Sequence, residues 1–234
     1  MYSDVFCKVY NQFGWNYFPE AFGEQLLEWM KHNRISIKDC LDLGCGTGVL
    51  CEILYRNGIK STGMDLSENM IAIARERNPE ICYEVANMVT YRPQRQFDLV
   101  TSTGDALNHI IALDDVKQIF RNVYECLRAG GFFIFDLLDE SEISTDEAID
   151  LDFSDNIKAQ FQMLRDVDGM VTLKTTVYEN GTQQFEERIM ETVHDRKVIC
   201  DMLQECGFEV LQCSHQLLEN IDSNALTWFV VARK

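Results

Sequence analysis

The stretch Leu41-Asp42-Leu43-Gly44-Cys45-Gly46-Thr47-Gly48 decides the fold of this 234-residue chain. An apolar run ends there in a turn with alternating glycines, and an amphipathic segment follows. Glycine has no Cβ, so such a turn can approach a ligand closely and adopt positive φ angles. A second apolar run ends at Asp65, whose carboxylate can accept hydrogen bonds from a ribose diol. The spacing predicts a nucleoside site at the carboxyl edge of a parallel sheet.

Apolar runs and amphipathic segments alternate along most of the chain. An aromatic amino-terminal region leads to Pro19, which we expect to open a helix. Asn57-Gly58 and Asn78-Pro79 supply helix stops. The alternation predicts a parallel, doubly wound α/β sheet. The expected strands are 39–43, 61–64, 81–85, 97–101 and 132–136, with helices at 49–57, 67–78 and 114–127 and a turn at 128–131.

The pattern changes after residue 136. Between residues 137 and 157 there are eight acidic residues and no basic one. Alternating runs at 159–164, 171–178 and 184–193 follow, separated by the hairpin signals Asp168-Gly169 and Asn180-Gly181. We therefore expect residues 137–194 to form a small antiparallel β subdomain inserted into a core of residues 1–136 and 195–234. That core is expected to close with a helix at 197–206 and two antiparallel edge strands at 208–213 and 226–232.

Charge, cysteine spacing and hydropathy argue against several classes of protein, namely nucleic-acid-binding, metal-binding and membrane proteins. The formal net charge is −17, from 38 acidic and 21 basic residues, which opposes binding to phosphate backbones and argues against a nucleic-acid substrate without identifying the true one. The nine cysteines include no C-x-x-C pair, so we expect reduced core thiols and no metal. With no apolar stretch long enough for a bilayer and no leader pattern, the expected location is cytoplasmic, without membrane partners.

The glycine turn differs from the dinucleotide fingerprint, because Gly48 comes one residue too early and Val49 takes the fingerprint position. The resulting G-x-G-x-G pattern resembles motif I of the class I S-adenosylmethionine-dependent methyltransferases. The resemblance covers residues 8–136 and 195–233, and it is similar to bacterial small-molecule members with a β-meander over the site. Tyr10-Asn11 and the segment 103–109 match those members. The resemblance implies a seven-stranded Rossmann-like sheet and S-adenosyl-L-methionine as cofactor.

The same resemblance implies a set of cofactor contacts. Gly44, Cys45 and Gly46 would line the methionine portion, and Asp65 would bind the ribose hydroxyls. Asp65 as a helix-capping acid and Met70 as a core residue are the structural alternatives. The other implied contacts are Leu66 and Met70 on the adenine, Asn87 (where the family has Asp) and Met88 at its edge, Ser102 and Thr103 beside the methyl group, and Tyr10 and Tyr17 as a cap.

Methyl transfer requires a base only when the acceptor carries a proton that must leave. His109 is the candidate base, because the resemblance places it facing the substrate and histidine titrates near neutral pH; the alternative is a core histidine. Asp105 could bind an amine or orient His109. Weaker candidates around the acceptor are His194, His215, Glu187 and Arg188.

The sequence thus predicts a methyltransferase that modifies an N or O atom of a small molecule. The segment Thr101-Ser102-Thr103-Gly104 lacks the Asn/Asp-Pro-Pro-Tyr pattern of enzymes that methylate nucleobase amines or glutamine amides. Three alternatives stay open at this stage: a protein or tRNA methyltransferase, a non-catalytic cofactor-binding protein, and a nicotinamide oxidoreductase.

Overall fold

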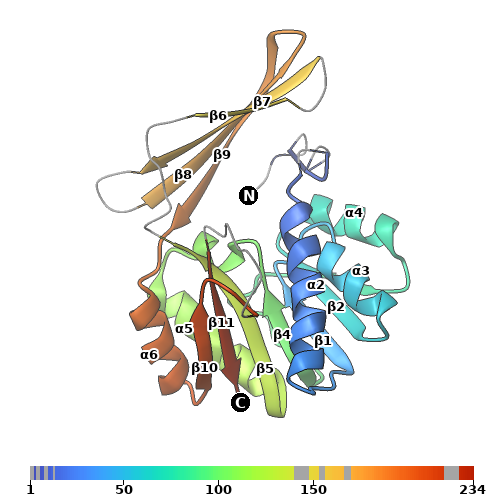
Figure 1. Cartoon of the computed structure of the whole chain (residues 1–234), viewed down its shortest axis with the longest axis vertical. Helices are drawn as coiled ribbons and strands as arrows, with labels where there is room; N and C mark the ends of the chain where they lie inside the picture. The colour runs from blue at the N-terminus through green and yellow to red at the C-terminus, as the bar shows by residue number, and fades with distance from the viewer. Residues whose placement is uncertain are drawn as a thin grey trace.

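The computed structural model describes the chain except for residues 1–2, 4–5, 8–9, 13, 140–147, 153–155, 166–169 and 219–226. The described strands form a seven-stranded sheet of order β10-β11-β5-β4-β1-β2-β3 and a four-stranded sheet of order β6-β7-β8-β9 (Figure 1). The elements are α2 (Tyr17–His32), β1 (Asp39–Leu43), α3 (Val49–Arg56), β2 (Lys60–Asp65), α4 (Glu68–Arg77), β3 (Cys82–Val85), β4 (Phe97–Ser102), the 3-10 helix η1 (Ala106–His109), α5 (Leu113–Cys126), β5 (Leu127–Leu138), β6 (Ile149–Asp152), β7 (Ile157–Arg165), β8 (Met170–Glu179), β9 (Thr182–Thr192), α6 (Arg196–Glu205), β10 (Glu209–Ser214) and β11 (Thr227–Arg233).

The large sheet is doubly wound, as the sequence predicts. Strands β1 to β5 pair in parallel, while β11 pairs antiparallel with both β5 and β10. Successive residues of a strand point to opposite faces: Leu99 packs with α2 and α3, and Val100 packs with α5 and α6. Helices therefore cover both faces (Figure 1), and the functional groups collect where the parallel strands end.

The structure corrects two predicted boundaries, the start of β5 and the start of α2. Residues 128–131, predicted as a turn, belong to β5, where they form an irregularity opposite the register shift between Phe97 and Leu99. Gly130 and Gly131 keep backbone partners there, because each bonds to Lys234 at 2.9 Å. Helix α2 begins at Tyr17, two residues before Pro19, which fits because proline is tolerated throughout a first helical turn.

The second sheet is an antiparallel meander that stands beyond one end of the large sheet (Figure 1). Its Asn180-Gly181 hairpin is confirmed: Glu179 pairs with Thr182, and both turn residues have positive φ, 51° and 75°, as a type I′ turn requires. The predicted Asp168-Gly169 turn and most of the acidic run lie outside the described residues. The meander thus lies within the predicted insertion of residues 137–194.

No helix in the described part of the chain is long and apolar enough to cross a membrane. All nine cysteines are free thiols. Five of them are buried, as expected for core residues, whereas Cys82 is exposed because its strand, β3, forms the sheet edge.

Candidate active site

The glycine turn after β1 is tied to the end of β2 by backbone hydrogen bonds. The N–H groups of Gly44 and Cys45 donate to the carbonyl of Met64 at 2.8 and 2.9 Å. The N–H of Gly46 donates to the Asp65 carboxylate at 3.0 Å. Burial raises the pKa of Asp65, while the donors around its carboxylate lower it. The strand tip and the turn therefore form one rigid unit.

Positive φ angles explain the glycines in this turn. Gly44 and Gly46 have φ of 75° and 51°, a region that costs a side-chain-bearing residue about 1–2 kcal/mol. A Cβ on Gly44 would also lie 2.9 Å from the Cβ of Ala106, whereas one on Gly46 would meet nothing within 4 Å. The backbone at Gly46 consequently faces open space in which a ligand can lie.

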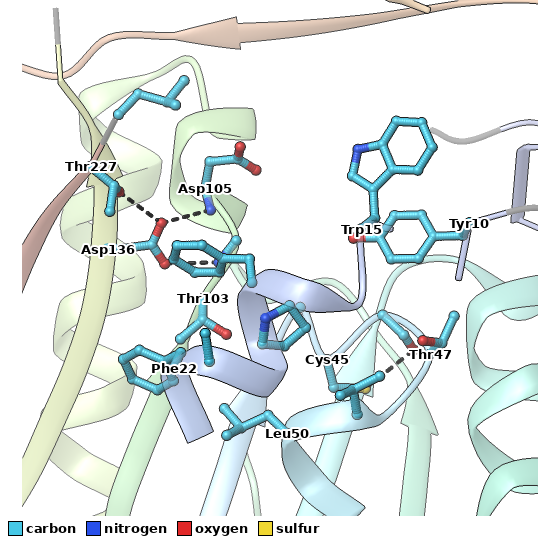
Figure 2. Close-up of a pocket in the computed structure, with 18 of the residues that line it drawn as sticks. Tyr10, Trp15, Phe22, Cys45, Thr47, Leu50, Thr103, Asp105, Asp136 and Thr227 are labelled. Carbon is cyan, nitrogen blue, oxygen red and sulfur yellow. Dashed lines mark hydrogen bonds between the residues drawn. The ribbon is translucent and has the colours of Figure 1, made fainter. Parts of the chain in front are cut away.

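A cavity of about 510 Å³ lies beside this turn. In Figure 2, Tyr10, Trp15, Cys45 and Thr47 lie on one side of it, and Asp105, Asp136 and Thr227 on the other. The meander contributes Met163, Leu173, Ile189 and Glu191 to its walls. The cavity is thus enclosed jointly by the large sheet, the amino-terminal segment and the meander.

The amino-terminal segment forms an aromatic wall. Tyr10 and Trp15 stack with ring centroids 5.6 Å apart, and Trp15 meets Phe161 of β7 edge-on at 5.2 Å. The hydroxyl of Thr47 donates to Asn11 Oδ1 at 2.9 Å. Burial, and then the negative charges of Asp105 and Asp65, raise the pKa of Tyr10. The wall is therefore anchored to both the glycine turn and the meander.

The opposite wall depends on Asp136, which is 2% exposed at the end of β5. Its carboxylate accepts from the N–H of Gly104 at 2.8 Å, the N–H of Asp105 at 3.0 Å and the hydroxyl of Thr227 at 3.1 Å (Figure 2). Burial raises its pKa to about 6 against the effect of these donors. Asp136 holds the turn between β4 and η1 in shape.

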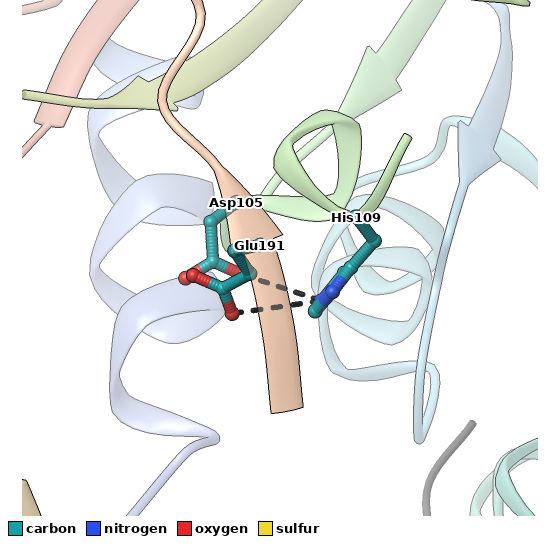
Figure 3. A group of neighbouring side chains, drawn as sticks. All are labelled: Asp105, His109 and Glu191. Atoms are coloured by element: carbon teal, nitrogen blue, oxygen red, sulfur yellow. Dashed lines mark ion pairs between the residues drawn. The ribbon is translucent and has the colours of Figure 1, made fainter. Parts of the chain in front are cut away.

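That turn presents Asp105 toward His109 and Glu191 (Figure 3). The Nε2 atom of His109 lies 3.8 Å from Asp105 Oδ1 and 3.9 Å from Glu191 Oε1. Burial and then the charge of Asp136 raise the pKa of Glu191 to about 7, while burial lowers that of His109. Burial, followed by the charges of Glu191 and Asp136, raises the pKa of Asp105 well above its usual range. Such a group can bind a cation or exchange a proton near neutral pH.

These three side chains also satisfy the spacing of a metal site, because one ligand atom of each lies within 4.8 Å of the others. Two carboxylates and an imidazole are a donor set that suits divalent transition metals. The same geometry therefore admits either a proton-handling or a metal-binding role, and these two roles are distinguishable by experiment.

The structure brings only part of the predicted cofactor set to the cavity. The predicted residues that line it are Tyr10, Gly44, Cys45, Gly46 and Thr103. Asp65 bonds to Gly46, which lines the cavity, but Asp65 is not itself part of the lining. Tyr17 is 71% exposed, and its ring packs beside Gly14 instead.

The remaining predicted cofactor residues lie outside the described cavity. Leu66 is 51% exposed, while Met70 is fully buried in the core. The other three make local contacts: Asn87 Oδ1 accepts from Val89 N at 2.9 Å, Ser102 Oγ donates to the Leu43 carbonyl at 2.9 Å, and Met88 packs 3.4 Å from a Cβ placed on Gly44.

The weaker acceptor candidates do not reach the cavity either. His194 is buried against the carbonyl of Leu107, and His215 contacts Asp139 at 3.1 Å. Glu187 accepts from Ser3, and Arg188 pairs with Glu186 on the exposed side. His109 is absent from the cavity lining but touches Asp105 and Glu191, which line it.

Sequence reasoning missed Asp136 and Glu191. Asp136 lies two residues before the end of β5, close to the sheet edge at which Asp65 ends β2, and an acid in that apolar run was the available signal. Glu191 shares a face of β9 with Ile189, because strand residues alternate. The alternation of β9 predicts that Glu191 lines the cavity only after the structure has shown that Ile189 does.

Comparison with known proteins agrees with the sheet topology and with the glycine turn described above. A family model described as a methyltransferase domain matches residues 40–131. A Geobacillus sp. strain WCH70 protein, whose name designates a methyltransferase without stating an acceptor, is 38% identical over 111 residues, covering 46% of this chain and 45% of that protein. A dTDP-4-amino-2,3,4,6-tetradeoxy-D-glucose N,N-dimethyltransferase of Saccharopolyspora spinosa is 24% identical over 135 residues, 58% of this chain and 53% of that protein. The chain thus spans about half the length of these two curated relatives.

Among solved structures, an S-adenosylmethionine-bound amino pentose methyltransferase of Micromonospora echinaspora, CalS10, superposes with a TM-score of 0.79. It shares 17% identity, and the match covers all of this chain and 98% of that one. At 17% identity the superposition shows a shared fold and nothing about the acceptor. Residues 40–131 are therefore a methyltransferase domain, and the chain has the fold and the glycine motif of the class I S-adenosylmethionine-dependent methyltransferases.

Proposed function

We propose that this methyltransferase transfers a methyl group from S-adenosylmethionine to the nitrogen of a small-molecule amine. The observation that carries the proposal is the acidic wall of the cavity. Asp105, Asp136 and Glu191 line this wall, opposite the glycine turn, and the cavity between them has a volume of about 510 Å³. A cavity of this size suits a small molecule. The prediction from sequence allowed nitrogen or oxygen, and the acidic wall favours nitrogen.

The residues of the turn fit the cofactor. Gly44, Cys45 and Gly46 would hold the methionine portion, because the backbone at Gly46 faces open space. The Asp65 carboxylate accepts from Gly46 N and Ser67 N at 3.0 and 2.8 Å, and the N–H of Leu66 also acts on it. A carboxylate has about four acceptor positions, so capacity remains for a ribose hydroxyl. Tyr10 and Thr103 would border the methyl-bearing side.

The surrounding walls supply orientation and exclude water. When bound, S-adenosylmethionine supplies a methyl group on a positively charged sulfur that leaves readily. The chain's contribution is then to align the acceptor nitrogen with that methyl group, which is the largest rate effect available to such a site. Trp15 of the amino-terminal segment and Ile189 of the meander close the cavity over the turn.

The acidic wall selects a basic acceptor. A protonated amine is stabilised by nearby carboxylates, whereas a neutral hydroxyl gains much less from them. The relatives named above include a methyltransferase of an amino sugar and one of an amino pentose, which supports the same acceptor class. The net charge of −17 favours a cationic small molecule and opposes tRNA as the substrate.

Two measurements test the proposal. Calorimetry with S-adenosylhomocysteine measures cofactor binding, and release of S-adenosylhomocysteine measures turnover with matched pairs such as glucosamine against glucose and ethanolamine against ethylene glycol. We expect binding, together with turnover of amines but not of their hydroxyl partners. Binding without turnover of any amine would favour a non-catalytic cofactor-binding protein, and turnover of hydroxyl compounds alone would overturn the choice of nitrogen.

A further inference from the structure

We propose that Glu191 of β9 is the proton acceptor of the reaction, removing a proton from the bound ammonium before methyl transfer. This inference rests on the proposed amine methylation and assigns its acid–base residue. The sequence predicts His109 for that role. The structure instead puts a carboxylate in the cavity wall and the imidazole behind it.

Burial and contacts distinguish Glu191 from the other acids of the wall. It is 3% exposed and lines the cavity. Among the described residues no hydrogen-bond donor reaches its carboxylate, whose recorded contact is His109 Nε2 at 3.9 Å. Asp136 is already committed to Gly104, Asp105 and Thr227. A buried carboxylate without donors is costly, so Glu191 has an unused capacity to take a proton.

The groups around Glu191 tune it for this step. The described ionisable groups that face it are Asp105 and His109 from the turn and η1, Asp136 from β5 and Tyr10 from the amino-terminal segment. Burial and the charge of Asp136 raise its pKa to about 7, so the carboxylate is both present and basic near neutral pH, as an efficient general base requires.

Proton transfer to Glu191 precedes methyl transfer. The N–H bond of the ammonium breaks, its electron pair stays on nitrogen, and the proton binds a Glu191 oxygen. The freed lone pair forms the N–C bond to the methyl group as the C–S bond breaks, with its electrons going to sulfur. The Nε2 atom of His109 lies 3.9 Å from Glu191 Oε1, and the His109 side chain is 28% exposed. A small rotation of either side chain would therefore let the imidazole take the proton from Glu191 and pass it to solvent.

The test compares Glu191→Gln with wild type, using the most active amine of the panel above. The substitution keeps size and removes the base, so we expect kcat near pH 7 to fall by about 100-fold or more. At high pH the amine deprotonates in solution, so the rate of the variant should recover toward wild type. Binding of S-adenosylhomocysteine should stay within about threefold of wild type. Glu191→Asp, which keeps a carboxylate, should retain the wild-type pH profile at a lower rate.

The matched control is Glu186→Gln, the same change on the same strand at an exposed residue outside the cavity lining; its rate and pH profile should equal those of wild type. Three results would overturn the inference: an unchanged rate for Glu191→Gln, an equal loss at every pH, or wild-type activity that disappears with EDTA and returns with Mn²⁺. The last result would make Asp105, His109 and Glu191 metal ligands. If wild type methylates no amine, the proposed function itself fails, which is a separate outcome.

Discussion

The Asp65 carboxylate accepts the N–H of Gly46 at 3.0 Å, so the tip of β2 and the glycine turn cannot move independently. The same carboxylate also accepts from Ser67 N at 2.8 Å, which places it between the turn and the start of α4. One side chain therefore organises the backbone on two sides of the proposed ribose site.

Replacing Asp65 with alanine should weaken binding of S-adenosylhomocysteine. Hydrogen bonds to a charged group contribute about 1.5–3 kcal/mol, so we expect a loss of about 10- to 100-fold in affinity. Calorimetry measures this directly. The control is Glu68→Ala, which removes the exposed acid in the first turn of α4 and should leave the affinity unchanged. Equal affinity for Asp65→Ala and wild type would contradict a ribose contact.

Alanine at Gly44 should destabilise the protein more than alanine at Gly46. Both positions have positive φ, which costs alanine about 1–2 kcal/mol. Only the Gly44 variant also brings a Cβ to 2.9 Å from Ala106, so its loss should exceed that of the Gly46 variant. Urea unfolding gives the comparison. Affinity for S-adenosylhomocysteine should fall in both variants, because the Gly46 methyl group would enter the open space proposed for the cofactor and the Gly44 methyl group would displace the turn against Ala106. Similar stabilities for the two would contradict the packing of Ala106 against Gly44.

Trp15→Ala should reduce cofactor affinity, whereas Tyr17→Ala should not. Trp15 stacks on Tyr10 in the cavity wall, and its removal opens the cavity to water and loses an aromatic pair contributing about 0.5–1.5 kcal/mol. We expect about a 3- to 10-fold loss in affinity for S-adenosylhomocysteine, measured by calorimetry. Tyr17 is 71% exposed and serves as the matched aromatic control. A loss for Tyr17→Ala alone would instead restore it as the residue that caps the cofactor.

Asp42→Asn should alter the dependence of stability on pH. Burial raises the pKa of Asp42 from 3.8 to about 6, so the folded protein holds this proton more tightly than the unfolded chain does. Its contribution is fully present below the unfolded pKa and is lost as pH rises through about 6. The shift corresponds to about 3 kcal/mol.

The asparagine variant lacks this titration, so its stability relative to wild type should increase between about pH 4 and pH 8. Its amide oxygen can still accept from the Thr101 hydroxyl, which donates to Asp42 at 2.7 Å. Urea unfolding at both pH values measures the difference. A constant difference between the two proteins across this range would show that Asp42 does not titrate as its burial implies.

Local sequence patterns predicted most of the large sheet because they report which residues share a face. The apolar run at 97–101 and the acid at the end of β2 required no knowledge of distant contacts. The boundary at residues 128–131 could not be found this way. Its glycines read as a turn, but pairing with the far carboxyl terminus at Lys234 makes them strand.

The candidate site was predictable only where its residues follow a local motif. Gly44, Cys45 and Gly46 belong to the glycine motif and line the cavity, while their contact with a cofactor stays a prediction. Tyr17, by contrast, was implied only by the family resemblance, and at the first residue of α2 its side chain is 71% exposed. Glu191 lies 86 positions after Asp105 in the printed sequence, and only the placement of the meander over the sheet brings the two together.

The cavity is built from two separate parts of the fold. The turn that would hold the cofactor comes from β1 and β2, whereas Met163, Leu173, Ile189 and Glu191 come from β7, β8 and β9. Mutations in the meander can therefore reshape the cavity for a different acceptor while the glycine turn and the end of β2, which would hold the cofactor, stay unchanged. A graft of another meander onto this scaffold would be expected to exchange acceptor preference and to retain the methyl donor.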